Sequence, residues 1–211
     1  MTRRIVYGIG LWITLGATAM TIASVVMPRW LRWEVPKSGI HYTYGLHERC
    51  SSLPGQEGCT SFPAYEDCHG DDRSFCSLWR SVGFLMSFAV ILELACVVGF
   101  AVVLLGGKQQ RDYGWKVLCG LLAVCGVVEC IGMGIVLTQS FPQAGLFNND
   151  TRFFAGWALD TSWILCTVSW TLLLATGTGI LMSAIFLPEE GGYELIPQER
   201  LEHAAGETLG G

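Results

Sequence analysis

Four long apolar runs, separated by polar segments, are the feature that most limits how this chain can fold. They cover about residues 5–27, 81–105, 117–137 and 162–187. Each is long enough to cross a membrane, because a helix of ~20 apolar residues spans ~30 Å of hydrocarbon. Hydrophobic residues make up 51% of the 211 residues and charged ones only 15%, which is too apolar for an ordinary soluble domain. We predict one four-span membrane domain over residues 1–187.

The first run has a second interpretation, as a cleaved secretory signal. Basic residues precede it, and Ala17 and Ala19 lie within it. It is longer than the ~7–15 residues typical of a signal's apolar region, so we expect a retained helix.

Charge predicts the orientation. The short segment 106–116 carries Lys108, Arg111 and Lys116, and two arginines precede the first run. Positive charge favours the cytoplasmic side. We expect both termini in the cytoplasm, with loops 28–80 and 138–161 outside the plasma membrane. The tail 188–211 is acidic and glycine-containing, so we predict that it is disordered.

The second loop supports the same orientation. Asn149 begins an Asn-Asp-Thr sequon, an N-glycosylation pattern that is used on extracellular loops. The loop is also aromatic, and its side chains could form a contact surface, lie at the lipid interface or cover the first loop. They are Phe141, Phe147, Phe153, Phe154 and Trp157.

The first loop contains Cys50, Cys59, Cys68 and Cys76. This many thiols in a polar loop indicates disulfides, hence an oxidising compartment. Four cysteines allow three connectivities. Closing short loops costs least entropy, which favours pairing Cys50 with Cys59 and Cys68 with Cys76.

A zinc site and a nucleophilic site are less well supported uses of these cysteines. His69 follows Cys68, but no two of the four cysteines have the close C-x2-4-C spacing of zinc modules. A nucleophilic cysteine would need a positioned base and an orienting acid, and no such set occurs here.

A β-hairpin is predicted after the first run. Residues 29–35 and 40–46 alternate as strands do, and 36–39 is a turn sequence. An isolated hairpin is marginally stable in water, so a disulfide is expected to hold it.

These features resemble the claudin-like tetraspan superfamily, which includes claudins, peripheral myelin protein, epithelial membrane proteins and gamma-type channel subunits. The matching positions are Trp30, Gly45, Leu46, Cys50, Cys59 and Arg80. His47 stands where the family has the tryptophan of its Gly-Leu-Trp motif. The second cysteine pair resembles the auxiliary-subunit and fungal branches. The resemblance implies a membrane all-α, left-handed four-helix bundle with a small extracellular antiparallel β-sheet.

Two acids lie within the apolar runs, Glu93 in the second and Glu129 in the third. A carboxylate near the bilayer centre costs roughly 3 kcal/mol, so such residues face the bundle interior. They could form an ion or proton relay, or bond to neighbouring helices. Antiparallel neighbours would bring the two acids to similar depth, where they could share a proton.

Small residues within the runs predict where helices approach closely. They are Gly8, Gly16, Ala17, Ala19, Gly120, Gly126, Gly132, Gly134, Gly177 and Gly179.

No catalytic, cofactor or metal constellation is present in the sequence, and no basic stripe suggests nucleic acid. We predict a non-enzymatic protein that organises the membrane or mediates adhesion through the stapled loop. Its partners would be the bilayer and either another membrane protein or a second copy. The alternatives are an auxiliary subunit of a channel or transporter, and an ion pore or transporter that uses Glu93 and Glu129.

Overall fold

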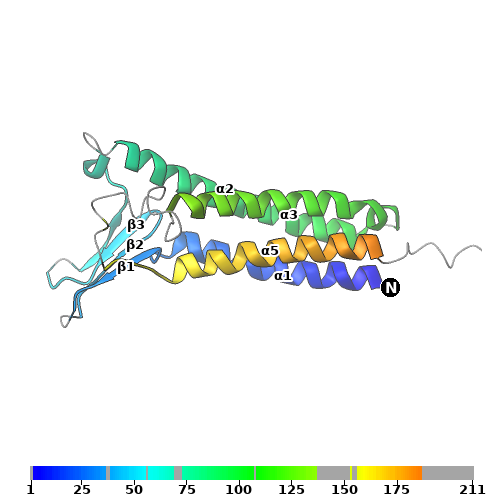
Figure 1. The fold of residues 1–211 in the computed structure, drawn as a ribbon, viewed down its shortest axis with the longest axis horizontal. Coiled ribbons are helices and arrows are strands. Elements are labelled where there is room, and N and C mark those ends of the chain that lie inside the picture. Colours follow the sequence, from blue (N-terminus) through cyan, green and yellow to red (C-terminus); the bar gives the residue numbers. More distant parts are fainter. Residues whose placement is uncertain are drawn as a thin grey trace, which may run out of the picture.

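The computed structural model describes residues 2–36, 39–55, 57–68, 73–106, 108–136, 153 and 156–186. Four long helices lie side by side, and a small sheet lies at one end of the bundle (Figure 1). The helices are α1 (Thr2–Val26), α2 (Arg73–Leu105), α3 (Lys108–Val136) and α5 (Thr161–Phe186). α1 and α3 each pack against both α2 and α5. The start of α1 and the end of α5 lie at the end of the bundle away from the sheet.

Each of the four helices is long and apolar enough to cross a membrane. Large apolar side chains cover the outside of the bundle: Trp12 is 75% exposed and Ile91 62%. An apolar outer surface of this extent suits lipid rather than water. α2 begins at Arg73 rather than at Ser81, so its first turns extend beyond the predicted span towards the sheet.

The buried positions of the helices repeat every seven residues, with alternating steps of four and three. In α5 they are Ser162, Cys166, Ser169, Leu173, Thr176 and Ile180. In α1 they include Thr14, Ala17, Thr21 and Ser24. A seven-residue repeat keeps one seam facing the partner helices and favours a left-handed bundle. Many side chains at these buried positions are polar or small, whereas the large apolar side chains face outwards.

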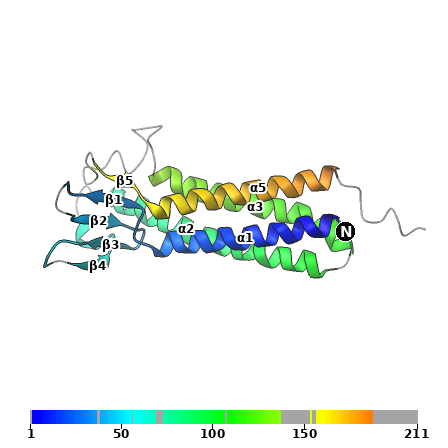
Figure 2. The same cartoon turned by 90° about the horizontal axis from the view of Figure 1, so that it is seen from below.

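Five strands form one antiparallel sheet in the order β4-β3-β2-β1-β5 (Figure 2). The predicted hairpin is present as β1 (Leu31–Glu34) and β2 (His41–Tyr44), shorter at both strands than expected. Three further strands were not predicted from the sequence: β3 (Glu48–Ser51), β4 (Gly58–Ser61) and β5 (Ala158–Leu159). β5 belongs to the loop between α3 and α5, so this loop and the loop between α1 and α2 build one sheet.

An aromatic cluster attaches the sheet to the first turns of α2. Phe75 and Trp79 of α2 pack against Phe62, and Phe62 meets Tyr44 of β2 edge-to-face at 4.7 Å between centroids. Phe153 from the second loop stacks on Trp79. The early start of α2 therefore supplies the surface on which the sheet rests.

The prediction of close approach was wrong for several glycines. A Cβ added at Gly8, Gly16, Gly120, Gly134 or Gly179 would meet nothing within 4 Å. Ala19 is exposed, whereas Ala17 is fully buried. Gly126 and Gly132 do allow close packing, because a Cβ there would lie 2.9 Å from Leu174 and 3.1 Å from Met86. At Gly177 the contact would be ordinary, 3.5 Å from Leu122.

Candidate functional site

Two disulfides lie in the segment between α1 and the first turn of α2. Cys50 pairs with Cys59, and Cys68 with Cys76, the connectivity that short loop closure favoured. The first joins facing residues of β3 and β4. The second joins the short 3-10 helix η1 (Glu66–Cys68) to the first turn of α2. Together they hold both ends of the β4–η1 segment.

Strand β4 forms an open edge of the sheet. Its four residues are all exposed, and among the described strands it pairs with β3 alone (Figure 2). The Cα atoms of Cys50 and Cys59 are 4.1 Å apart, the close spacing of a non-hydrogen-bonded pair. The Phe62 amide donates to the His47 carbonyl, so these two residues form a hydrogen-bonded pair. Hydrogen-bonded and non-hydrogen-bonded pairs alternate along the strands, which makes the Glu48–Ser61 pair non-hydrogen-bonded as well. The backbone N–H and C=O of Cys59 and Ser61 therefore point away from β3, towards the open edge.

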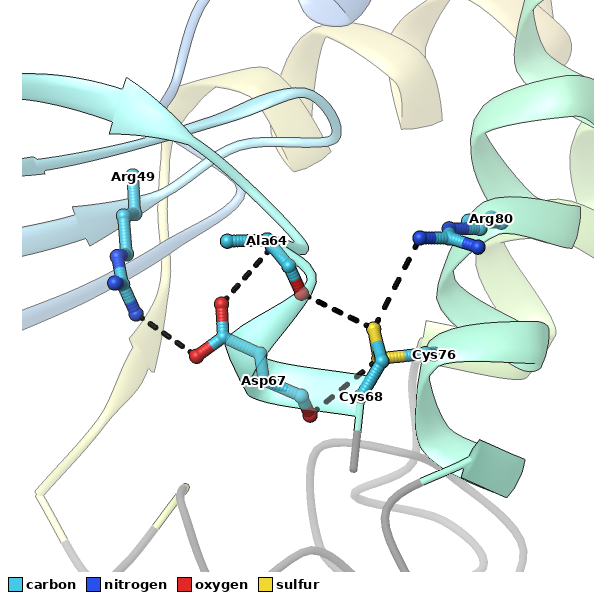
Figure 3. The surroundings of a disulfide bond; sticks show 6 residues. All are labelled: Arg49, Ala64, Asp67, Cys68, Cys76 and Arg80. Carbon is cyan, nitrogen blue, oxygen red and sulfur yellow. Dashed lines mark hydrogen bonds and ion pairs between the residues drawn. A yellow bond between two sulfur atoms is a disulfide. The ribbon is translucent and has the colours of Figure 1, made fainter. Parts of the chain in front are cut away.

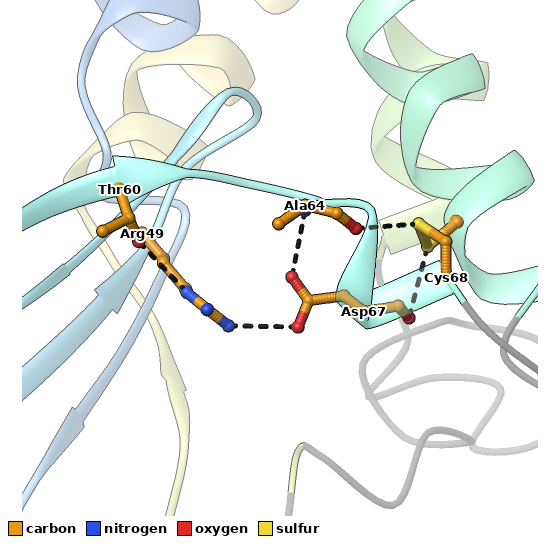
Figure 4. A network of polar contacts seen from close by, with 6 residues as sticks. Arg49, Thr60, Ala64, Asp67 and Cys68 are labelled. Carbon is orange, nitrogen blue, oxygen red and sulfur yellow. Dashed lines mark hydrogen bonds and ion pairs between the residues drawn. A yellow bond between two sulfur atoms is a disulfide. The ribbon is translucent and has the colours of Figure 1, made fainter.

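An ion pair joins β3, the neighbour of the edge strand, to η1. Arg49 Nη1 of β3 lies 3.1 Å from Asp67 Oδ1, and Arg49 Nε donates to the Thr60 hydroxyl at 3.2 Å (Figure 4). The other Asp67 oxygen accepts the Ala64 amide at 3.0 Å. β3, β4 and η1 are thus joined by polar contacts as well as by sulfur.

The family-like motif residues have clear packing roles. Trp30 is fully buried and donates its indole N–H to the Ser24 carbonyl at the end of α1. Leu46 is also buried, in the same cluster. A Cβ at Gly45 would lie 2.4 Å from the Pro28 Cα, so only glycine fits there. His47, in the place of the family's tryptophan, is exposed and lies beside Gly83 of α2.

Arg80, the last motif residue, lies on α2 beside the second disulfide (Figure 3). Its Nη2 is 3.9 Å from Cys68 Sγ. Cys68 Sγ also lies 3.2 Å from the Ala64 carbonyl oxygen and Cys76 Sγ 3.5 Å from that of Asp67. These carbonyl contacts are not hydrogen bonds, because oxidised sulfur carries no proton.

The second loop contributes to the same structure. Phe153 and Trp157 cover the sheet of the first loop, since both contact Tyr44 edge-to-face. The Asp160 amide donates to the Trp30 carbonyl, and the Ser162 hydroxyl donates to the Met27 carbonyl. The predicted glycosylation site Asn149 and the aromatic residues Phe141, Phe147 and Phe154 lie outside the described residues.

The two intramembrane acids meet inside the bundle. Glu93 and Glu129 are both fully buried, and a carboxyl oxygen of each lies within 4.8 Å of the other and of Cys125 Sγ. Two negative charges so close in a dry core repel strongly, and one shared proton removes that repulsion. Glu93 Oε2 has no donor among the described residues, and such a proton would supply one.

All four helices contribute to the surroundings of this acid pair. The Thr21 hydroxyl of α1 lies 2.7 Å from both Glu93 Oε1 and the Ser169 hydroxyl of α5. The Cys125 thiol lies 3.7 Å from Glu129 Oε1, and the Cys166 thiol 3.8 Å from Glu129 Oε2. The acids therefore join the helices through a buried polar network.

Among the described residues, two groups of side chains have metal-ligating atoms close together. Glu93, Cys125 and Glu129 form one, a mixed set of two hard carboxylates and one soft thiol, but a shared proton and thiol bonds already fit their geometry. Glu48, Cys50 and Cys59 form the other, and their two sulfurs are used in a disulfide.

No protein-family model matches this chain, and no curated protein matches it either.

Proposed function

We propose that this chain is a non-enzymatic, claudin-like four-span protein of the plasma membrane. It would organise the membrane or mediate adhesion through its extracellular sheet, with both termini in the cytoplasm. The proposal is supported by the four apolar helices, by the sheet confined to one end of the bundle, and by the oxidised cysteines there. An oxidising compartment suits an extracellular position.

The observation that carries the proposal is the open edge at β4. An exposed edge strand invites pairing with another chain, and proteins usually shield such edges. Here the edge is rigid, because a disulfide joins β4 to β3 and an ion pair joins β3 to η1. Outward amide and carbonyl groups on a rigid strand suit β-strand addition, with a second copy or another membrane protein as partner.

Photo-cross-linking tests the edge. A benzophenone amino acid at Thr60 is expected to cross-link a partner in cell membranes. The same group at His41, exposed on the middle strand β2 and paired on both sides, is the matched control and should give little product. Ser61→Pro removes one outward N–H without removing a ladder bond to β3, so it should abolish the Thr60 cross-link. Equal cross-linking at both sites, or none at either, would contradict the proposal.

The acid pair favours a structural role over a pore. Glu93 and Glu129 are fully enclosed, and each is bonded to a group from a neighbouring helix: Thr21 of α1 and Cys166 of α5. A transport path needs polar groups that continue across the membrane. If Glu93→Gln and Glu129→Gln lowered an ion flux measured in vesicles, the pore alternative would replace this proposal.

A second candidate is an auxiliary subunit of a channel or transporter, in which the same edge binds one large polytopic partner. The second disulfide, which resembles that branch of the superfamily, favours it. Cross-linking at Thr60 separates the two functions, because the mass of the product shows whether the partner is a second copy.

A further inference from the structure

A cavity of about 820 Å³ lies beside the outer end of α2, next to the second disulfide. Arg73, Ser77 and Arg80 line it from one face of the helix, and Tyr65 lines it from the segment before η1. The Cys68–Cys76 disulfide forms part of its wall, and Figure 3 shows Arg80 directed towards that wall.

The described lining of the cavity is positively charged, because it contains two guanidinium groups and no carboxylate. Within the part of the chain that the structure describes, neither Arg73 nor Arg80 is in an ion pair; the arginines that are paired there are Arg32 and Arg49. Arginine on a helix face with serine hydroxyls beside it is suited to phosphate oxygens.

The inner end of the cavity is apolar. Phe84 and Leu85 line it there, and Phe84 is 70% exposed. The Phe84 ring lies parallel to that of Phe88, with 6.2 Å between centroids. Polar and apolar ends joined in one cavity match a lipid better than they match a soluble anion.

The position along α2 places this change of polarity at the membrane surface. The outer face of α2 is apolar from Phe84 to Leu105, and at 1.5 Å per residue this stretch is roughly 32 Å long. The hydrocarbon core is ~30 Å thick. Arg80, one helical turn beyond Phe84, then lies at the depth of the lipid phosphates.

We propose that this cavity binds the phosphodiester headgroup of a glycerophospholipid from the outer leaflet. The phosphate lies between Arg73 and Arg80, and an acyl chain lies over Phe84 and Phe88. This site goes beyond the proposed function: it depends on insertion of the helices in a membrane and not on the β4 edge. Failure of the cross-linking test leaves it unaffected.

Native mass spectrometry of the full chain in detergent tests the site. Palmitoyl-oleoyl phosphatidylglycerol and phosphatidylcholine are titrated, with the matching diacylglycerol and inorganic phosphate as comparison ligands. Both phospholipids should bind, and diacylglycerol should not. Arg80→Gln and Arg73→Gln should each weaken phospholipid binding about tenfold, since a hydrogen bond to a charged group is lost. Arg32→Gln, on the exposed sheet, is the matched control and should bind as the wild type does.

A variant with an added negative charge, together with a disulfide check, completes the experiment. Ser77→Glu puts a carboxylate into the cavity at an exposed position, so it should repel the phosphate without disturbing the core. Intact mass then confirms that both disulfides have formed in every variant. Equal binding of diacylglycerol, full displacement by inorganic phosphate, or unchanged affinity in all three cavity variants would each overturn the proposal.

Discussion

The Thr21 hydroxyl is the best place to test the buried polar network. It lies 2.7 Å from Glu93 Oε1, 2.7 Å from the Ser169 hydroxyl and 3.2 Å from the Ala17 carbonyl oxygen. It therefore connects α1 to α2 and α5. Thr21→Val keeps the shape of the side chain and removes only the hydroxyl, so the loss can be assigned to hydrogen bonding.

The expected loss of unfolding free energy depends on the hydrogen bonds that Ser169 and Glu93 keep in the variant. Ser169 keeps the Ala17 carbonyl as an acceptor at 3.0 Å, whereas Glu93 Oε1 loses its donor. Hydrogen bonds between membrane helices average ~0.6 kcal/mol, with a maximum of ~1.7. An orphaned buried acceptor costs ~1–3 kcal/mol. We expect Thr21→Val to lower the free energy of unfolding by about 1 kcal/mol, at the overlap of these ranges.

Steric trapping in bicelles measures this free energy at equilibrium. Thr18→Val and Thr178→Val are the controls. The Thr18 hydroxyl is buried but donates within α1, and the Thr178 hydroxyl is exposed and donates within α5. Both should cost less than Thr21→Val. A double-mutant cycle with Glu93→Met should show a coupling of at least ~0.5 kcal/mol. Equal costs for all three threonines, or no coupling to Glu93, would refute the network.

The remaining predictions concern the two loops that build the sheet. Gly45→Ala should destabilise the fold by ~1–3 kcal/mol, because its Cβ would overlap backbone after α1; Gly8→Ala, with open space around it, should not, as thermal unfolding will show. Replacing Cys50 and Cys59 together with serine should cost roughly 3 kcal/mol in chemical unfolding, and the difference should shrink under reducing conditions, which open the wild-type disulfide; a difference that is unchanged by the reductant would contradict the role of the disulfide. Asn149→Gln should remove a glycosidase-sensitive mass shift, and a shift that persists would contradict an extracellular second loop.

The number of helices and the stapled loop could be predicted, because each depends on local sequence. Apolar runs of sufficient length specify membrane-type helices by themselves. The four cysteines of the first loop lie at short separations, so their pairing follows from loop closure. The hairpin of β1 and β2 was predicted for the same reason, since its strands and its turn are adjacent.

The remainder of the sheet was not predictable from local pattern. β3 contains Ser51, and β4 contains Gly58 and Ser61. Neither strand shows much of the alternation of apolar and polar residues that identifies a strand in a sequence. β5 is only Ala158–Leu159 and pairs with a strand more than a hundred residues earlier. Its position exists only because the helices bring both loops to one end of the bundle.

The sequence determined that four apolar helices and an oxidised loop would form, since these properties depend on composition and on neighbours along the chain. Tertiary structure decided which face of each helix is buried, because all faces of a membrane helix are apolar enough to meet lipid. It selected the seam that carries Thr21, Glu93, Glu129 and Ser169, where hydrogen bonds have no water to replace them. In α1 and α5 the signal was a seven-residue spacing of polar residues, Thr14 and Thr21 in the first and Ser162, Ser169 and Thr176 in the second, and it has a clear meaning only once the helices are packed.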